Sequence, residues 1–227
     1  MGRFDGKLAV VTGGRGGIGR ACALALREAG ATVAVIAKSK DRGDLPLDGI
    51  AYIQADLSRQ SDRMNLIPYK FMKVDILVNN AGISYLHPAL EYPEDERREV
   101  WEVNYHAAVD LACQAVRLGC KRIINIASIS GRNGARNISE YAASKAALIQ
   151  WTKCASNEWA PQGVTVNCIS PGFIQTDMLV INKENIGRIP VGRVGTPEEV
   201  ARFVMDVLQN EYITGADLLI DGGFCGR

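Results

Sequence analysis

The chain has 227 residues, of which 47% are hydrophobic and 22% charged, a balance typical of a folded globular protein and unlike that of a disordered or fibrous one. The 26 Lys and Arg nearly cancel the 25 Asp and Glu, which argues against nucleic acid or an anionic membrane as the main partner and favours a small molecule. At this length we expect one α/β domain, residues 1–227.

Short apolar runs alternate with amphipathic stretches along the whole chain, the pattern of βαβ units in a parallel sheet with helices on both faces. The pattern predicts a doubly wound seven-stranded parallel sheet. Strands are expected at Leu8–Thr12, Thr32–Ala37, Ala51–Gln54, Ile76–Asn79, Arg122–Ala127, Val164–Ile169 and Asp217–Ile220. Helices are expected at Gly17–Ala29, Glu94–Arg117, Glu140–Trp159 and Pro197–Leu208, the last after an N-cap at Thr196.

Two stretches break the regular alternation. Lys40–Gly49, between the second and third strands, contains two glycines and a proline and is predicted to be a loop rather than a crossover helix. Ser61–Phe71 is predicted to hold a short helix that is interrupted at Pro68.

No targeting or metal signal stands out. The amino-terminal residues lack the apolar core of a signal peptide and no stretch is long and apolar enough for a membrane span, so we expect a cytoplasmic protein. The six cysteines show no Cys-x-x-Cys spacing and are interpreted as reduced core thiols. His87 and His106 have no partner at ligand spacing, so we predict no metal site.

A glycine cluster, Thr12–Gly19, follows the first strand and opens the first helix. Glycine at such a turn allows positive φ and lets the backbone approach a pyrophosphate that rests on the helix amino terminus. Strand, cluster and helix in this order predict a dinucleotide site, the alternative being a tight structural turn. The cluster residues assigned to the nucleotide are Gly13, Arg15, Gly17, Ile18 and Gly19.

The end of the second strand bears on the choice between NAD and NADP. Sites that prefer NAD usually carry an acid there, which holds the ribose 2′-hydroxyl. Here Lys38 and Ser39 stand instead, with Arg15 or Lys40 as further cations for a 2′-phosphate, so NADP(H) is favoured over NAD(H). The alternative is that Lys38 and Lys40 are solvated loop lysines. The next two strands end in residues expected to line the adenine and ribose: Asp56, Leu57, Asn80, Ala81 and Gly82.

Tyr141 and Lys145 are four residues apart on an expected helix and therefore share one face. Acid-base chemistry by a tyrosine near neutral pH requires about 4 kcal/mol in favour of phenolate, which is the size of one lysine charge at ~4 Å in an effective dielectric of ~20. By itself, this spacing is typical of an exposed helix pair.

Two further residues favour the catalytic interpretation. Ser128 follows the fifth strand, at the same sheet edge as the glycine cluster, where its hydroxyl can hold a carbonyl oxygen. Asn104 lies inside an otherwise amphipathic helix, where asparagine is a poor choice unless its amide serves a specific network. We therefore predict Asn104, Ser128, Tyr141 and Lys145 as the catalytic set.

Together these motifs resemble the short-chain dehydrogenases/reductases, which carry Thr-Gly-x3-Gly-x-Gly, Asn-Asn-Ala-Gly, a helical Asn, a Ser and Tyr-x3-Lys. The resemblance covers essentially the whole chain, including 170–178 after the sixth strand, and implies a Rossmann fold and a homo-oligomer, a tetramer or a dimer. It also implies that Tyr141 exchanges the proton, Ser128 polarises the carbonyl and Lys145 binds the nicotinamide ribose. Asn104 would anchor a water-linked proton relay. Pro171, Gly172, Ile174 and Thr176 would complete the cofactor site, with Ile174 and Thr176 at the carboxamide.

Within that family, 172–178 and 191–200 look most like 3-oxoacyl-carrier-protein reductases, which is the favoured interpretation. The alternative is a sugar-acid or polyol dehydrogenase, because 157–160 and 189–193 look equally like dehydrogenases of sugar acids such as gluconate or ketodeoxygluconate. The expected substrate is thus a small-molecule or carrier-bound carbonyl compound, reduced or formed by hydride transfer. Three departures from the family pattern are the missing helix after the second strand, the short segment between Met178 and Pro190, where a substrate lid is usual, and Arg15, one residue ahead of the usual basic position. A non-catalytic dinucleotide sensor on the same fold is the alternative of a different class.

Overall fold

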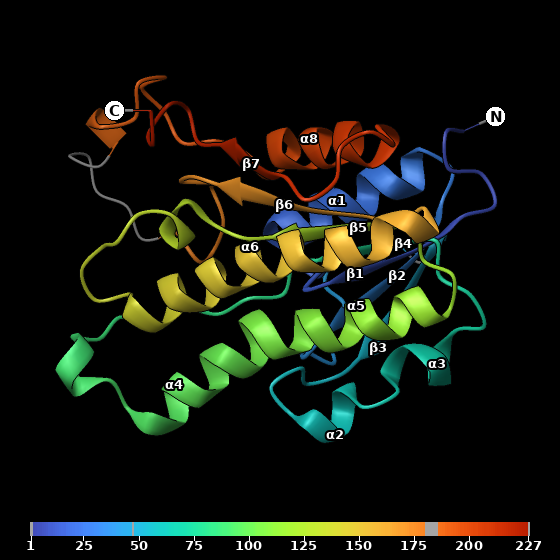
Figure 1. Cartoon of the computed structure of the whole chain (residues 1–227), viewed down its shortest axis with the longest axis horizontal. Coiled ribbons are helices and arrows are strands. Elements are labelled where there is room, and N and C mark those ends of the chain that lie inside the picture. The colour runs from blue at the N-terminus through green and yellow to red at the C-terminus, as the bar shows by residue number, and fades with distance from the viewer. Residues whose placement is uncertain (1, 47, 180–185, 227) are drawn as a thin grey trace.

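The computed structural model describes residues 2–46, 48–179 and 186–226 and shows a central sheet between two layers of helices (Figure 1). The sheet has seven parallel strands in the order β3-β2-β1-β4-β5-β6-β7, which confirms the predicted doubly wound fold. The strands are β1 (Leu8–Thr12), β2 (Thr32–Ala37), β3 (Ile50–Gln54), β4 (Ile76–Asn79), β5 (Arg122–Ile126), β6 (Thr165–Pro171) and β7 (Asp217–Ile220). The order reverses between β1 and β4, the point where ligands bind in such sheets.

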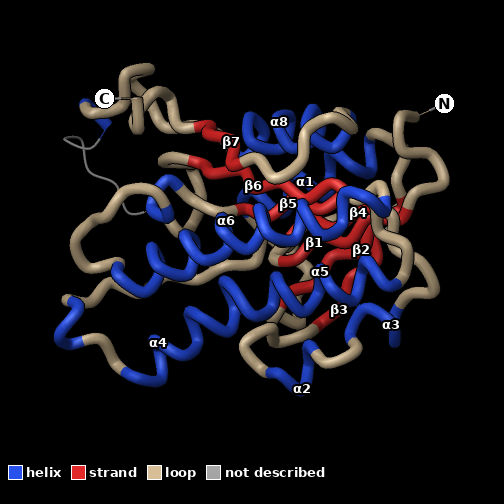
Figure 2. The backbone as a smooth tube through the Cα atoms, viewed as in Figure 1, coloured by secondary structure: helices blue, strands red, loops and turns tan. Residues whose placement is uncertain are grey.

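Helices cover both faces of the sheet (Figure 2). Helices α1 (Gly17–Glu28) and α8 (Pro197–Gln209) lie together on one face, whereas α5 (Ala107–Arg117) and α6 (Ser139–Trp159) lie on the other. Successive residues of β1 point to opposite sides, because Val11 is buried in the core beneath α1 and α8 while Val10 is buried in the core beneath α5. The last helix begins at the predicted cap, where Thr196 and Glu199 form a reciprocal capping box.

The helix expected over Glu94–Arg117 is not uniform. Helix α4 (Glu94–Trp101) passes into a π-helical turn, η2 (Glu102–His106), before α5 begins. A π turn inserts a residue into the helical ladder and shifts the side chains that follow. Asn104 lies in this turn, so the residue that looked out of place in a helix marks the point where the α-helical geometry is interrupted.

The prediction for Ser61–Phe71 was wrong about where the helix breaks. The segment forms α2 (Gln60–Arg63) and α3 (Leu66–Lys70), and the chain breaks at Asn65, whose φ of 58° lies in the left-handed region. Pro68 lies in the first turn of α3, where its missing N–H has no helical acceptor to lose.

The described residues between β2 and β3 form a loop without a helix, as predicted. Side chains bond to its backbone and order it. The Tyr52 hydroxyl donates to the carbonyls of Ser39 and Asp41 at 2.9 and 3.1 Å, and the Arg42 guanidinium donates to the carbonyls of Pro46 and Ile50. These bonds replace the backbone pairing that a crossover helix would supply.

A buried polar ladder crosses from the sheet to the helices on the α5 side. Asn79 of β4 and Asn125 of β5 stand opposite each other in register, and the Asn79 amide donates to the Asn125 Oδ1 at 2.9 Å and to the Ala108 carbonyl at 3.0 Å. The Asn125 amide in turn donates to the Thr152 hydroxyl of α6 at 2.8 Å, and that hydroxyl donates to the Leu148 carbonyl. The ladder fixes α5 and α6 against the two central strands.

Arg63 is a buried cation that ties α2 to the π turn. Its guanidinium lies 2.6 Å from a Glu102 carboxylate oxygen, donates to Asp110 at 3.0 Å and also donates to the Leu57 carbonyl at 2.8 Å. Its side chain is only 4% exposed, so the two acids compensate a charge that water does not reach.

The cysteines are free thiols, three of them buried: Cys22, Cys120 and Cys168. Burial raises the pKa of each of these three to about 12, which keeps them protonated and unreactive. Cys154 is exposed, in contrast to the expectation of core thiols. Within the described ranges, no cluster of three or more metal-ligating side chains occurs and no helix has the length and apolar character of a membrane span.

Candidate active site

The carboxyl edge of the sheet brings the glycine cluster against the loop that follows β4. Gly13 has a φ of 64°, and a Cβ on it would lie 2.9 Å from both the Ala81 Cα and the Asn80 Nδ2. A Cβ on Gly19 would lie 2.3 Å from the same amide nitrogen. Glycine is therefore required at both positions for the cluster to pack on Asn80 and Ala81.

Thr12 holds these two segments together. Its hydroxyl accepts hydrogen bonds from the backbone N–H groups of Asn80 and Ala81, both at 3.0 Å. The Asn80 side chain returns two bonds, to the carbonyls of Thr12 and Gly13 at 3.0 and 3.2 Å. The Asn80 side chain, which was expected to line the nucleotide, thus forms hydrogen bonds that stabilise the turn of the glycine cluster. Thr12 was not among the predicted site residues, although its place between strand and glycine cluster is a usable signal.

The amino terminus of α1 fits a pyrophosphate. Its N-cap is Gly16, so no side chain caps the first amides and no acid occupies the first turn, which includes Ile18. A Cβ on Gly16 would meet nothing within 4 Å, whereas one on Gly17 would lie 3.0 Å from the Thr176 methyl. Backbone N–H groups without a side-chain cap, at the positive end of a helix dipole, can bind an anion. Thr176 faces the same turn.

Cations and acids meet near the carboxyl end of β2. Lys38 Nζ lies 3.2 Å from Asp56 Oδ2 and 3.3 Å from Glu99 Oε1, and the hydrogen bond with Asp56 contributes most to raising the pKa of Lys38. Arg15 makes an ion pair with Asp41 at 3.0 Å. The Ser39 hydroxyl accepts from the Asp41 N–H at 3.1 Å. Each donor expected for a 2′-phosphate is therefore already in contact with an acid: Lys38 with Asp56 and Glu99, and Arg15 and Ser39 with Asp41.

Asp56 and the neighbouring Leu57 sit where the third strand ends. The Asp56 carboxylate accepts from the Ser58 hydroxyl at 2.7 Å and lies 3.7 Å from the Arg59 guanidinium. Burial acts to raise the pKa of this acid, but its hydrogen bonds with Ser58 and Lys38 outweigh burial and lower the pKa. Leu57 is buried in the core beneath α5, with its carbonyl bonded to Arg63. Asp56 therefore stands at the edge of the candidate site, while the Leu57 side chain faces the interior.

Tyr141, Lys145 and Ser128 come together at the end of β5. The Lys145 ammonium is buried, donates to the Ile126 carbonyl at 2.8 Å and lies 5.9 Å from the centre of the Tyr141 ring. Burial raises the pKa of Tyr141, and a hydrogen bond with the Ser128 side chain opposes this rise. The Ser128 hydroxyl also accepts from the Ser130 N–H at 3.1 Å.

The expected effect of the lysine on the phenol is not the dominant one. Burial outweighs the other influences on Tyr141, and it lowers the pKa of Lys145 to about 8. The ammonium is directed to a backbone carbonyl rather than to the phenol. The pair shares one helix face, as the spacing predicted, but Lys145 is buried and Tyr141 is partly buried, so it is not an exposed pair.

Asn104 joins the π turn to the post-β4 loop. Its amide accepts from the Ile83 N–H at 2.8 Å and donates to the Ile83 carbonyl at 2.9 Å and to the Ser144 hydroxyl at 3.1 Å. A Cβ on Gly82 would lie 3.3 Å from both the Asn104 Oδ1 and the Lys145 Nζ, so the amide and the ammonium border the same small space. Ser144, beside Lys145 in the chain, was not predicted, although its position three residues after Tyr141 places it on that helix face.

The segment after β6 closes the other side of the edge. Gly172 packs closely on the residue that follows β7, since a Cβ there would lie 2.8 Å from the Asp221 Cα, and the preceding Pro171 ends β6. Ile174 is buried and lines a cavity of about 210 Å³ together with Ile189 and Ile220. The short segment between Met178 and Pro190 includes 180–185, which lie outside the described residues.

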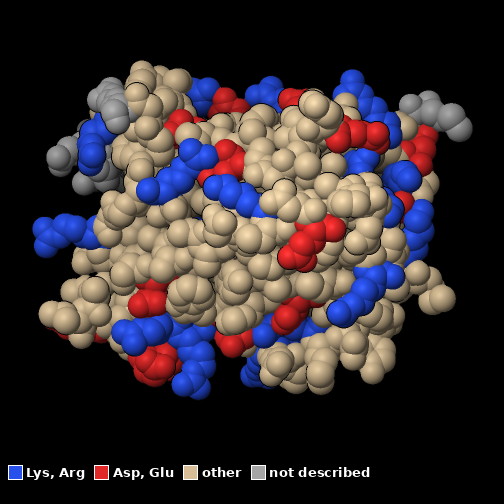
Figure 3. Space-filling model, viewed as in Figure 1, with Lys and Arg blue, Asp and Glu red and all other residues tan. Residues whose placement is uncertain are grey.

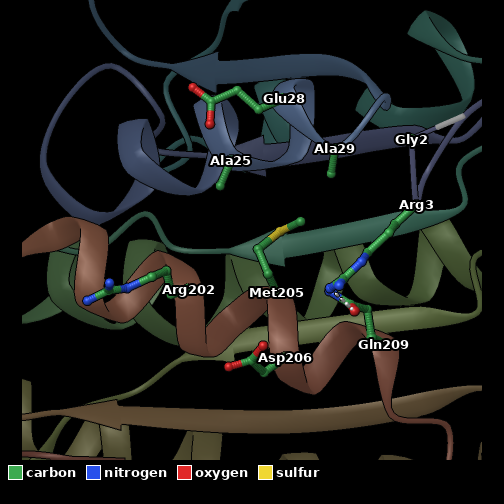
Figure 4. Close-up of a pocket in the computed structure, with 9 residues that line it drawn as sticks. All are labelled: Gly2, Arg3, Ala25, Glu28, Ala29, Arg202, Met205, Asp206 and Gln209. Atoms are coloured by element: carbon green, nitrogen blue, oxygen red, sulfur yellow. Dashed lines mark hydrogen bonds between the residues drawn. The ribbon is translucent and has the colours of Figure 1, made fainter.

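A second hollow lies at the opposite edge of the sheet. It is a shallow groove between the carboxyl end of α1, helix α8 and the amino-terminal residues, and includes Arg3, Glu28 and Arg202 (Figure 4). Arg3 donates to Gln209 across it at 2.5 Å. Because α1 runs antiparallel to the strands, this groove and the glycine cluster lie at opposite ends of that helix. It contains none of the predicted site residues.

Comparison with known proteins agrees with this arrangement. Residues 7–186 match the family model of the short chain dehydrogenases. The 3-oxoacyl-[acyl-carrier-protein] reductase FabG of Vibrio cholerae is 37% identical over 238 residues, covering 97% of this chain and 98% of that protein. The FabG of Chlamydia pneumoniae is 33% identical over 239 residues, covering 96% of each chain.

Solved structures show the same likeness. A short-chain type dehydrogenase/reductase from Mycobacterium marinum superposes with a TM-score of 0.90 at 32% identity, covering 99% of this chain and 97% of the other. A putative NAD(P) dependent gluconate 5-dehydrogenase from Beutenbergia cavernae, solved with bound NADP at low occupancy, also gives 0.90, at 36% identity and 98% coverage of both chains. The chain therefore belongs to the short-chain dehydrogenase/reductase family of oxidoreductases.

Proposed function

We propose that the protein is an NADP(H)-dependent enzyme that interconverts a ketone and a secondary alcohol, with Tyr141 as the acid-base residue. The observation that carries the proposal is that Asn104 Oδ1 and Lys145 Nζ both lie next to Gly82. Gly82 belongs to the loop that is hydrogen-bonded to Thr12 beside the glycine cluster. A nucleotide seated on that cluster would have its reactive end directed toward Tyr141 and Ser128.

The nucleotide would lie along the carboxyl edge of the sheet. The proposed contacts are the glycine cluster with Ile18 for the pyrophosphate, Asp56 with the 80–82 loop for the adenosine, and the segment from Pro171 to Thr176 for the nicotinamide. Lys38, Ser39 and Arg15 would receive a 2′-phosphate. The Beutenbergia relative was solved with NADP, which supports this choice of nucleotide.

In the proposed reaction, bound NADPH supplies the hydride to the carbonyl carbon. The hydroxyls of Ser128 and Tyr141 donate hydrogen bonds to the carbonyl oxygen as negative charge develops on it, and Tyr141 transfers its proton to that oxygen. The raised pKa of Tyr141 keeps it protonated and ready to donate. With a pKa of about 8, Lys145 is mostly charged at neutral pH and stabilises the phenolate that the transfer leaves.

The proposed substrate is a 3-oxoacyl thioester, on a carrier protein or a small thiol. The FabG relatives, at 33–37% identity over nearly their whole length, support this choice. The Beutenbergia structure supports a second candidate, a sugar acid such as gluconate. No metal is part of the proposed chemistry.

The protein is also proposed to be a cytoplasmic homo-oligomer, a dimer or tetramer. Figure 3 shows the face over α5 and α6, where the middle of the surface carries few charged side chains and the charges gather toward the margins. Such a face suits contact with a second copy. Light scattering after size-exclusion chromatography gives the test, since a monomer at micromolar concentration would contradict this part of the proposal.

The test of function is a screen at 340 nm with NADPH and NADH against acetoacetyl thioesters, keto sugar acids, cyclic ketones and quinones. Tyr141→Phe is expected to lose most of the turnover, about 10²-fold or more, and to keep nearly normal NADPH affinity, because the phenol acts mainly in the transition state. Tyr212→Phe is the matched control, since Tyr212 is 99% exposed.

Near-normal turnover of Tyr141→Phe would contradict its assigned role. An absence of nucleotide oxidation across the whole panel, with nucleotide binding intact, would favour the dinucleotide sensor instead.

A further inference from the structure

Glu99 is an acid of α4 that reaches the proposed 2′-phosphate site from outside the nucleotide-binding motifs. Its Oε1 lies 3.3 Å from Lys38 Nζ, and its Oε2 accepts a hydrogen bond of 2.6 Å from the Tyr85 hydroxyl. The Tyr85 bond fixes the carboxylate in place, and the pKa of Tyr85 rises to about 12 chiefly because of it. Glu99 thus presents a fixed negative charge to the lysine expected to select the nucleotide.

Lys38 contacts both Asp56 and Glu99 and can move away from them to bind a phosphate. Its side chain is 66% exposed, and its two acidic neighbours each keep other partners if the ammonium turns away. Asp56 retains Ser58 and Arg59, and Glu99 retains Tyr85. A 2′-phosphate can therefore take Lys38 without leaving either carboxylate wholly unpartnered, but it must do so against two negative charges within 3.3 Å of the ammonium.

We propose that Glu99 is a specificity-determining residue that weakens the preference for NADP(H) by competing with the 2′-phosphate for Lys38. The inference rests on the proposed function, in which Lys38 receives that phosphate. A 2′-phosphate carries close to two negative charges and meets repulsion from Glu99, whereas the 2′-hydroxyl of NAD(H) is neutral and meets none. Removing the carboxylate charge therefore strengthens NADP(H) binding and leaves NAD(H) binding unchanged.

The experiment is a fluorescence titration of the full chain with NADPH and NADH, for the wild type and Glu99→Gln. The expected result is a three- to tenfold lower Kd for NADPH, roughly the effect of one charge on a phosphate across a partly solvated surface, with the Kd for NADH within about twofold. The gain should shrink in 0.5 M salt. Glu99→Asp, which draws the carboxylate back by one methylene, should give a smaller change in the same direction.

Glu96→Gln is the matched control. Glu96 lies one turn earlier on α4 and its carboxylate contacts His87 at 2.6 Å rather than Lys38, so its removal changes the net charge equally. A gain as large as that of Glu99→Gln would show that net charge alone is responsible and would overturn the proposal. In the Lys38→Met background, Glu99→Gln should gain less than it does in the wild type, because competition for Lys38 is gone and only the direct repulsion between Glu99 and the phosphate is relieved.

The experiment distinguishes failure of the NADP(H) proposal from failure of the proposal for Glu99. If the wild type binds NADPH no tighter than NADH, and 2′,5′-ADP no tighter than 5′-AMP, the NADP(H) proposal fails and the role of Glu99 fails with it. If the wild type prefers NADPH and Lys38→Met removes the preference, but Glu99→Gln leaves NADPH affinity unchanged or weaker, only the role of Glu99 is overturned. A weaker affinity would mean that Glu99 orients Lys38 for the phosphate instead of competing with it.

Discussion

Lys145→Met is expected to stabilise the fold while it removes the proposed activity. Burial lowers the pKa of Lys145 from its usual 10.5 to about 8, which corresponds to about 3 kcal/mol against the charged form in the folded state. Methionine has a similar length and no charge to bury. It leaves the Ile126 carbonyl without its 2.8 Å donor, a loss of about 1 kcal/mol. The free energy of unfolding at pH 7 should therefore rise by about 2 kcal/mol.

The pH dependence identifies the cause. Between about pH 8 and 10.5 the folded wild type binds fewer protons at this lysine than the unfolded chain does, so its stability relative to the variant rises with pH. The advantage of Lys145→Met should disappear over this range. Urea unfolding followed by tryptophan fluorescence at pH 7 and 9.5, at equal protein concentration, measures both values.

Two results would refute this reasoning. A variant that is less stable than the wild type at pH 7 would show that the ammonium contributes more through its contacts than it costs through burial. A stability difference that does not change between pH 7 and 9.5 would show that the pKa of Lys145 is not lowered in the folded protein.

Three further substitutions test other parts of the structure. Arg63→Met removes the buried cation that Glu102 and Asp110 contact and should lower the free energy of unfolding by about 1–3 kcal/mol in urea titrations. Arg98→Met, at a 72% exposed side chain, should change it by no more than about 0.5 kcal/mol, and equal losses in the two variants would contradict a structural role for Arg63. Thr12→Val deprives the N–H groups of Asn80 and Ala81 of their acceptor, and should reduce the free energy of unfolding by about 1–3 kcal/mol. It should also weaken NADPH binding in fluorescence titrations. Unchanged binding would show that these two hydrogen bonds do not support the nucleotide site. Thr196→Ala removes the N-cap of α8 and should reduce the free energy of unfolding by about 1 kcal/mol without affecting NADPH affinity. A changed NADPH affinity would contradict the local role of the cap.

The sequence predicted the sheet well because periodicity and turn residues report directly on strands and helices. Observed bounds differ from the expected ones at three strands: β3 begins one residue earlier, β5 ends one residue earlier, and β6 begins one residue later and ends two residues later. The break at Asn65 was missed because proline is the stronger helix breaker in a sequence, and the sequence does not show that Pro68 falls in a first turn.

The candidate site was predictable in its parts but not in its contacts. Asn104 stood out as a misfit in a helix, yet nothing in the spacing indicated a π turn or its bonds to Ile83. The cations at the end of β2 were visible, whereas Glu99 was not, because it reaches Lys38 from a helix 61 positions further along the chain. Long-range partners of this kind depend on the packing of α4, which local patterns do not encode.

The ladder of Asn79 and Asn125 also has a consequence for how the chain folds. A slip of one residue between β4 and β5 would turn one of the two amides to the opposite face of the sheet, where only apolar side chains would meet it. A misaligned pairing would then leave an amide in the interior without a hydrogen-bond partner, which costs about 1–3 kcal/mol for each such group. Apolar strands alone tolerate shifted pairings, so the hydrogen bond between the two amides favours the native alignment of the central strands over a shifted one.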